Sequence, residues 1–289
     1  MRFLSPLRYP GGKAKLAPYF GRLIDAQKQP VNHYAEPFAG GAGAGLHLLH
    51  SGKIQYLHIN DINPGIAAFW RCVFFDTGSF IERVMTSPID VPEWWAAREV
   101  YDSPAGHSDL DLGFATFYLN RTNRSGILTA RPIGGLDQAG RWKIDARFNK
   151  VDLVARIRLL RSYAASVQVT QMDASDFLWS LESFGSELLA YVDPPYLVQG
   201  DDLYLHAYSE SAHLNLATQL AEIRLPWVLT YDSDPRISEV LYSDQRCAEF
   251  GISHTAQVQH IGKEYVVFSK DLIVPDMQIT ARSEAAWLA

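Results

Sequence analysis

The sequence predicts an α/β fold in which a largely parallel sheet is interrupted by a mostly helical insert. Apolar runs typical of short strands alternate with helical periodicity in residues 1–75 and again in residues 161–275. Between them, residues 76–160 carry helical patterns with aromatic faces and then a glycine-rich stretch. Residues 276–289 show neither pattern and are expected to form a loosely held tail.

The expected elements follow the chain order of such a fold. Residues 33–38 and 54–60 are predicted strands, with a glycine turn and a helix through residues 46–52 between them, which is how a doubly wound sheet begins. In the insert, glycine and turn residues at 125–145 predict a hairpin or an extended loop. Further strands are expected at residues 167–171, 188–192, 226–231, 247–253 and 263–269, and further helices at residues 79–87, 91–103, 111–121 and 212–223.

Composition narrows the class of protein. Hydrophobic residues make up 47% of the chain and charged residues 20%, which is ordinary for a soluble globular protein. No apolar run is long enough to span a bilayer, and no N-terminal stretch has the pattern of a signal peptide. The two cysteines, Cys72 and Cys247, show neither metal-ligand spacing nor a disulfide framework. We therefore expect a cytoplasmic protein without a metal site or a role in a membrane.

Charge is distributed unevenly along the chain. The formal net charge of −6 by itself disfavours a nucleic-acid-binding protein, whose contact surface is usually basic. Residues 121–161, however, contain ten basic and only three acidic side chains. This local excess favours contact with a polyanion, with a solvated pair of basic helices as the alternative. Candidates for contact with DNA in this stretch are Arg124, Arg131, Arg141 and Lys143.

The first motif of chemical interest is the Pro-Gly-Gly turn of residues 7–15, which Lys13 follows. A phosphate-binding P-loop would need a glycine five residues before Gly12, but Leu7 occupies that position. Lys13 is instead suited to meet a carboxylate as a point charge. The alternative is a surface turn without a ligand.

A glycine loop follows the first predicted strand, at residues 36–46. Such a loop lets the backbone approach a ligand closely, but Leu46 stands where the dinucleotide-binding fingerprint has its third glycine. Glu36 next to the loop would repel a pyrophosphate and would suit a ligand with an ammonium and a sulfonium group. Asp61, at the end of the next strand, can accept hydrogen bonds from ribose hydroxyls. The pattern therefore favours S-adenosylmethionine over NAD, with a purely structural turn as the alternative.

The most specific motif is Asp-Pro-Pro-Tyr at residues 193–196, directly after an apolar strand. Consecutive prolines fix φ and remove two backbone donors, which leaves the Pro194 carbonyl to accept a hydrogen bond beside the Asp193 carboxylate. Two adjacent acceptors suit an exocyclic amine, and Tyr196 offers a flat face on which a base can stack. The alternative is a rigid turn. Asp173, at another strand end, is suited either to bind the adenine amine of the cofactor or to cap a helix.

In combination and in chain order, these motifs resemble the Dam-type DNA adenine N6-methyltransferases over residues 5–270. The resemblance implies a Rossmann-like S-adenosylmethionine-dependent methyltransferase sheet, with a target-recognition domain at residues 76–160 and the catalytic domain at residues 1–75 and 161–275. It implies double-stranded DNA as the partner and a flipped-out adenine as the target. The catalytic residues that it implies are Asp193, Pro194, Pro195 and Tyr196.

The same resemblance assigns the cofactor site and a stretch of the insert. The main implied cofactor contacts are Tyr9, Lys13, Asp61 and Asp193, together with Gly11, Gly12, Glu36, Pro37, Phe38, Gly40, Gly43 and Asp173. Residues 117–128 resemble the segment that leads into the DNA-reading hairpin of the family, which adds Arg121 and Asn123 to the DNA-binding candidates. Two departures are Tyr9, where the family often has tryptophan, and a divergent recognition segment, which leaves the target sequence open.

Other functions remain open at this point. N4-methylation of cytosine would use a similar amine but is more often associated with Ser-Pro-Pro-Tyr, and methylation of a protein glutamine with Asn-Pro-Pro-Tyr. An inactive, cofactor-binding DNA-binding regulator is the alternative from another class. Neither cysteine follows a proline, so the nucleophilic route to cytosine C5 has no candidate residue. A cognate restriction endonuclease is a further candidate partner, and the oligomeric state is left open.

Overall fold

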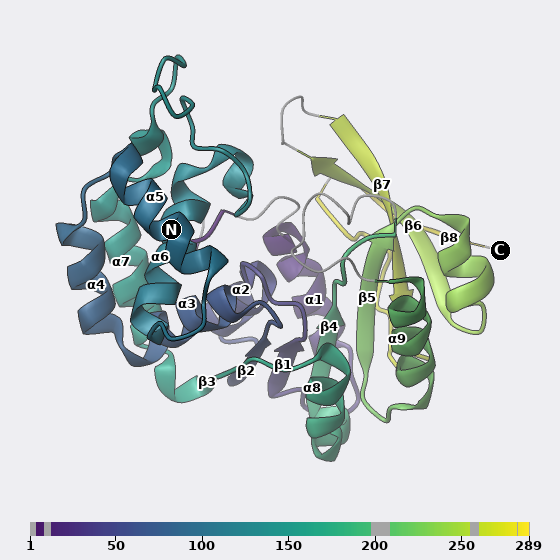
Figure 1. The fold of residues 1–289 in the computed structure, drawn as a ribbon. Helices are drawn as coiled ribbons and strands as arrows, with labels where there is room; N and C mark the ends of the chain where they lie inside the picture. The colour runs from purple at the N-terminus through teal and green to yellow at the C-terminus, as the bar shows by residue number, and fades with distance from the viewer. Residues whose placement is uncertain (1–3, 9–12, 198–208, 255–259, 282, 289) are drawn as a thin grey trace.

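The computed structural model describes residues 4–8, 13–197, 209–254, 260–281 and 283–288, and its centre is one eight-stranded sheet with the order β3-β2-β1-β4-β5-β7-β6-β8 (Figure 1). Each strand predicted from the sequence is present, within a few residues of its expected bounds. The strands are β1 (His33–Glu36), β2 (Tyr56–Asn60), β3 (Val167–Thr170), β4 (Leu188–Val192), β5 (Trp227–Asp232), β6 (Arg246–His254), β7 (His260–Phe268) and β8 (Ala286–Trp287).

Strands β1 to β5 are parallel, and β7 runs antiparallel between β5 and β6. In the register of the central pair, Tyr34 on β1 lies opposite Leu189 on β4. The chain first builds the sheet from β1 toward β3 and then returns to continue it from β4 in the other direction. This reversal of strand order is typical of a doubly wound, Rossmann-like sheet, and the α/β class predicted from the sequence is confirmed.

Helices cover both faces of the sheet, and the side chains of the strands alternate accordingly. On β4, Leu189 and Tyr191 belong to one apolar core, whereas Leu188, Ala190 and Val192 belong to the other. Burial on both faces explains why β4 reads as a continuous apolar run. The helices on the first face are α1 (Ala17–Asp25), α2 (Gly43–His50) and α3 (Pro64–Phe75), and those on the second are α8 (Ala174–Ser180) and α9 (Glu210–Glu222).

The insert between β2 and β3 is a helical body that packs against α3. Its helices are α4 (Thr77–Thr86), α5 (Val91–Asp102), α6 (Asp109–Thr122) and α7 (Lys150–Arg161), and they gather on one side of the sheet in Figure 1. Phe69 of α3 and Phe117 of α6 stack with ring centroids 5.7 Å apart. Helix α6 begins at Ser108, whose side chain accepts a hydrogen bond from the Asp111 N–H.

The loop after α6 differs from a hairpin. Its β pairing is a single isolated bridge between Asn123 and Pro132, and no ladder forms within residues 123–147, all of which are described. The side chain of Gln138 connects the two arms of the loop instead. Its amide nitrogen donates to the carbonyls of Ile133 and Gly135, and its amide oxygen accepts from the Ile144 N–H. Of the two forms expected for this stretch, the extended loop is therefore the one that the structure contains.

The expectation of a loosely held C-terminal tail is wrong. Ile279 and Ala285 are buried in the core on the first face, and Trp287 of β8 lies opposite Ala248 of β6. Asp276 forms an ion pair with Arg22 of α1, with 2.8 Å between the charged atoms. These apolar residues are too widely spaced to form a periodic pattern, so the sequence gives no sign that they are buried. Within the described residues, no helix has both the length and the apolar character needed to cross a membrane.

Candidate active site

The point where strand order reverses lies between β1 and β4, and the loops that follow these two strands contain the candidate residues. In parallel sheets, ligands bind beside the carboxyl ends of the strands at this point. The glycine loop follows β1 at Glu36, and Asp193 follows β4 directly. The carboxyl group of Asp193 is close enough to that of Glu36 to raise the pKa of Glu36. The fold therefore brings together two motifs that lie more than 150 residues apart in the sequence.

The glycine loop is held in shape by hydrogen bonds to the neighbouring strand and to α3. Gly40 has a positive φ of 45°, a conformation that glycine adopts without strain. Its N–H donates to Oδ2 of Asp61 over 2.9 Å, and its carbonyl accepts from the indole N–H of Trp70 over 2.9 Å. Asp61 thus orients the loop from the end of β2, in addition to any contact with a ligand.

Burial alters the ionisation of both carboxyl groups beside this loop. Burial raises the pKa of Glu36 to about 8, with a further contribution from Asp193, although the Gly45 N–H donates to its Oε1 over 2.7 Å. Burial also raises the pKa of Asp61 to about 6, against the effect of N–H groups from Asn63 and Gly40 that bind the ionised form. At neutral pH, Glu36 is therefore mostly protonated, whereas Asp61 is mostly ionised.

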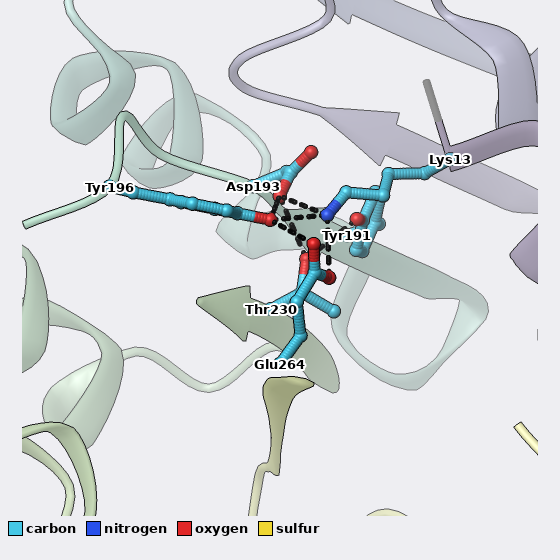
Figure 2. Close-up of polar contacts among 6 residues, drawn as sticks. All are labelled: Lys13, Tyr191, Asp193, Tyr196, Thr230 and Glu264. Carbon is cyan, nitrogen blue, oxygen red and sulfur yellow. Dashed lines mark hydrogen bonds and ion pairs between the residues drawn. The ribbon is translucent and has the colours of Figure 1, made fainter. Parts of the chain in front are cut away.

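Asp193 is oriented by residues of β4 and β5. Thr230 on β5 donates a hydrogen bond from Oγ1 to Oδ1 of Asp193 over 2.8 Å, and the Tyr191 hydroxyl lies 2.7 Å from the same Thr230 oxygen. In Figure 2 these contacts converge on one carboxylate oxygen of Asp193, and the second oxygen points away from the cluster. Burial raises the pKa of Asp193, Lys13 opposes that rise, and Glu264 adds to it.

Lys13 lies between two carboxylates and a phenol. Its Nζ is 2.8 Å from Oε2 of Glu264 and 3.4 Å from Oδ1 of Asp193, and it also donates to the hydroxyl of Tyr196 (Figure 2). Tyr196 donates in turn to Oε1 of Glu264 over 2.9 Å. Burial alone would lower the pKa of Lys13, but the two carboxylates outweigh it and raise that pKa. The lysine therefore stays charged inside the site.

Glu264 is a site residue that the sequence did not reveal. It lies on β7, is 1% exposed, and binds Lys13 with one oxygen and Tyr196 with the other. In the sequence it is one polar residue at the start of an apolar strand, where a solvent-exposed glutamate is the ordinary interpretation. The only signal in the sequence was its position at the start of an otherwise apolar run.

The other candidates are placed as follows. Pro194 and Pro195 are buried beside Asp193, and the carbonyl of Pro37 accepts a hydrogen bond from Asn60 over 3.0 Å. Asp173 accepts from the Ser175 N–H over 2.8 Å as the N-cap of α8, which is one of its two expected roles. Phe38 packs against the core on the second face, and Gly43 begins α2. Tyr9, Gly11 and Gly12 lie outside the described residues.

The DNA-binding candidates of the insert fall into two groups. The side chains of Arg124, Arg131, Arg141 and Lys143 are exposed. The side chain of Asn123 is buried and hydrogen-bonded to Trp94, Ile127 and Leu128, so it is not accessible to DNA in this structure. Arg121 is largely buried as well, and burial together with three neighbouring arginines lowers its pKa to about 9. The expectation that Asn123 contacts DNA is therefore corrected.

The loop of the insert also exposes an aromatic residue that the sequence analysis did not single out. Trp142 is 65% exposed, and the guanidinium of Arg141 lies 5.4 Å from its ring centroid. In the neighbouring helix α5, Trp94 is buried but Trp95 is exposed. Two consecutive positions on a helix point about 100° apart, so only one of them faces the core.

Comparison with known proteins identifies a family of DNA methyltransferases. The model of the D12 class N6 adenine-specific DNA methyltransferases matches residues 9–261. Among solved structures, the rRNA methyltransferase aviRa from Streptomyces viridochromogenes is similar at 14% identity and a TM-score of 0.38, with 92% of this chain and 88% of that chain covered. Among curated proteins, no match was found. Membership of a family of DNA methyltransferases implies DNA as the substrate and, in general, S-adenosylmethionine as the methyl donor. The chain belongs to the D12 class N6 adenine-specific DNA methyltransferases.

Proposed function

We propose that this protein transfers a methyl group from S-adenosylmethionine to N6 of an adenine that has been flipped out of duplex DNA toward Asp193. The observation that carries the proposal is the position of Asp193, which lies at the reversal of strand order beside the glycine loop of β1. A base amine and a methyl donor would meet there. We assign the target amine to Asp193 and Pro194, and the donor to the loop and to Asp61.

The target amine needs activation, because its lone pair is delocalised into the ring. We propose that the outward-pointing oxygen of Asp193 and the carbonyl of Pro194 each accept one N–H (Figure 2). Accepting both hydrogens favours a tetrahedral nitrogen with a localised lone pair. Thr230 and Lys13 hold the other Asp193 oxygen, so the carboxylate is already oriented before the base arrives. Extrusion of the base costs a few kcal/mol, and stacking on the Tyr196 ring offsets part of that cost.

The residues around the glycine loop fit S-adenosylmethionine, which supplies an electrophilic methyl group. Burial is the main cause of the raised pKa values of Glu36 and Asp193, so positive charge brought beside these carboxyl groups would stabilise their ionised forms. An ammonium and a sulfonium group provide it, whereas a pyrophosphate would add repulsion. Asp61 ends β2 at the position suited to ribose hydroxyls. We therefore propose that Lys13, Glu36, Gly40, Asp61 and Asp193 form the cofactor site.

For DNA, we propose that the exposed basic side chains of the loop after α6 make the contacts. Arg124, Arg131, Arg141 and Lys143 all lie on this loop, which extends away from the helices of the insert in Figure 1. Loss of an arginine that reads a base would relax sequence specificity, whereas loss of a phosphate contact would reduce the salt dependence of binding. A cognate restriction endonuclease stays a prediction from the sequence.

The product of the reaction tests the function directly. Duplex DNA from a methylation-free host is incubated with the protein and S-adenosylmethionine, digested to nucleosides and analysed by mass spectrometry. We expect N6-methyladenine, and we expect none with the Asp193→Ala variant. N4-methylcytosine would indicate the closest alternative, and unmodified DNA would indicate a binding protein without activity. The family match favours neither of these alternatives.

Cofactor binding is expected to depend on pH through Asp61. The ribose hydroxyls donate to the ionised carboxylate, whose pKa is about 6 in the free protein. Below that pKa the group is protonated, so the dissociation constant of S-adenosylhomocysteine should increase as pH falls from 7 to 5, approaching tenfold per unit. Isothermal titration calorimetry measures this dependence. Asp61→Asn should bind weakly and lose the part of this dependence that begins near pH 6, and an unchanged dependence in that variant would contradict the assignment.

A further inference from the structure

The N-terminal segment that leads to Lys13 is bound to the insert by side chains. The Arg8 N–H donates to Oδ1 of Asn120 over 2.7 Å, and Nδ2 of Asn120 donates to the Arg8 carbonyl over 2.7 Å. One buried amide thus pairs with both backbone groups of one residue, as a neighbouring strand would. Asn120 lies near the end of α6 and is 0% exposed. Arg8 precedes Lys13 by five positions.

Close packing at Gly126 strengthens the same junction. Nδ2 of Asn120 also donates to the Gly126 carbonyl over 2.9 Å. Gly126 has a φ of +78°, and a Cβ atom at this position would lie 2.5 Å from the Arg8 carbonyl oxygen. The two backbones can therefore approach this closely only with glycine at position 126. The loop after α6 is therefore in close van der Waals contact with the Arg8 backbone, in addition to the hydrogen bonds from Asn120.

Two arginines of the insert extend the contact toward the N-terminus. Arg121 donates to the Pro6 carbonyl over 3.4 Å, and Arg156 donates to the Ser5 carbonyl over 3.2 Å. The guanidinium of Arg8 returns a hydrogen bond to the Asn123 carbonyl over 3.1 Å. Residues 5–8 are thus fixed by α6, α7 and the loop after α6. Arg8 is thus the last described residue before Lys13 that contacts the insert.

We propose that Asn120 is a positioning residue for methyl transfer. By pairing with the backbone of Arg8, it holds the chain in place five residues before Lys13, and it thereby couples the insert to the cluster that Lys13 forms with Asp193, Glu264 and Tyr196. The inference rests on the proposed function. Lys13 contacts Asp193, Glu264 and Tyr196 at hydrogen-bond distances. Such a constellation tolerates displacements of only about 0.5 Å. Because Arg8 precedes Lys13 by only five positions, we expect a shift of Arg8 to change the position of Lys13.

The chain offers a matched pair of variants. Asn123 is also 0% exposed, and its amide likewise donates to two carbonyls, those of Ile127 and Leu128, and accepts one N–H, from Trp94. All partners of its side chain lie inside the insert. Asn120→Asp and Asn123→Asp therefore each remove two donated side-chain hydrogen bonds from equally buried positions, and only the first change removes a side-chain hydrogen bond to Arg8.

The experiment compares kcat, KM for S-adenosylmethionine, KM for duplex DNA and thermal stability of these variants in full-length protein. Rates are measured well below each melting temperature. We expect similar losses of stability, but a fall in kcat of about tenfold to a hundredfold only in Asn120→Asp, with KM for DNA within threefold of wild type. Equal kcat values for the two variants would overturn the proposal, as would a defect of Asn120→Asp confined to KM for DNA.

If Asn120→Asp does not fold, a pair of glycine variants decides the question. Gly126→Ala places a methyl group against Arg8 without changing the Asn120 side chain, whereas Gly106→Ala has the same positive φ and no atom within 4 Å of the added Cβ. We expect reduced kcat in the first variant alone, and equal kcat values would overturn the proposal. N6-methyladenine formation by wild-type protein tests the proposed function separately, since it does not depend on the difference between paired variants.

Discussion

Alanine in place of Asp193 is expected to abolish methyl transfer and to weaken cofactor binding. In the proposed mechanism, the carboxylate accepts a hydrogen bond from the target amine and also contributes negative charge beside the sulfonium. Removal of a single preoriented electrostatic partner from a transition state typically costs about 10²- to 10³-fold in kcat. Because Asp193 also supplies the acceptor for the nucleophile, we expect a loss at or beyond the upper end of that range.

Two measurements separate these roles of Asp193. Incorporation of a radiolabelled methyl group into duplex oligonucleotides reports turnover, and calorimetry with S-adenosylhomocysteine reports cofactor binding. Asp193→Asn is the matched control, because it keeps the shape and one oxygen but places an amide where an acceptor is needed. We expect it to be nearly as inactive as the alanine variant. Wild-type turnover in Asp193→Ala would refute the proposed role of the residue.

The loss of the Tyr196 ring is expected to have the next largest effect. Base–aromatic stacking is worth about 1–3 kcal/mol per base, so Tyr196→Ala should lose about fivefold to 150-fold in turnover from stacking alone. Tyr196→Phe keeps the ring and removes only the hydroxyl, which contacts Lys13 and Glu264. Both partners of the hydroxyl are charged, and a hydrogen bond to a charged group contributes about 1.5–3 kcal/mol to stability. Because the ring on which the base stacks remains, the phenylalanine variant should still retain more turnover than the alanine variant.

The two Tyr196 variants are compared by steady-state turnover and by the fluorescence of 2-aminopurine at the target position. An extruded 2-aminopurine is brighter, because it is no longer stacked in the duplex. We expect bright complexes with wild type and Tyr196→Phe and dim complexes with Tyr196→Ala. Equal turnover of the alanine and phenylalanine variants would argue against stacking on this ring.

Much of the fold could be predicted from local patterns in the sequence. The strand before Asp193 reads as buried because both faces of β4 are covered, and its end is marked by consecutive prolines. Helices such as α6 carry aromatic residues with helical periodicity, together with a serine cap at residue 108. These signals depend on neighbours within a few residues, which is the range over which sequence periodicity is informative.

Features that depend on distant partners could not be predicted in this way. Glu264 is a site residue only because β7 inserts antiparallel beside β5, which brings it to Lys13. The pairing of Asn120 with Arg8 joins residues separated by 112 positions. The sequence indicated Asn123 as a DNA contact, but its side chain is buried inside the insert. In each case the side chain is ordinary in its local sequence, and only the tertiary structure determines its partner.

We expect the buried carboxyl group of Glu36 to couple cofactor binding to the release of a proton. With a pKa of about 8, it holds its proton at pH 7 in the free protein. A cation arriving next to it favours the ionised form, so that proton is expelled into the buffer as the complex assembles. The apparent binding enthalpy should then vary with the ionisation enthalpy of the buffer. Above pH 8 the cofactor should bind more tightly, because Glu36 has already lost its proton in the free protein.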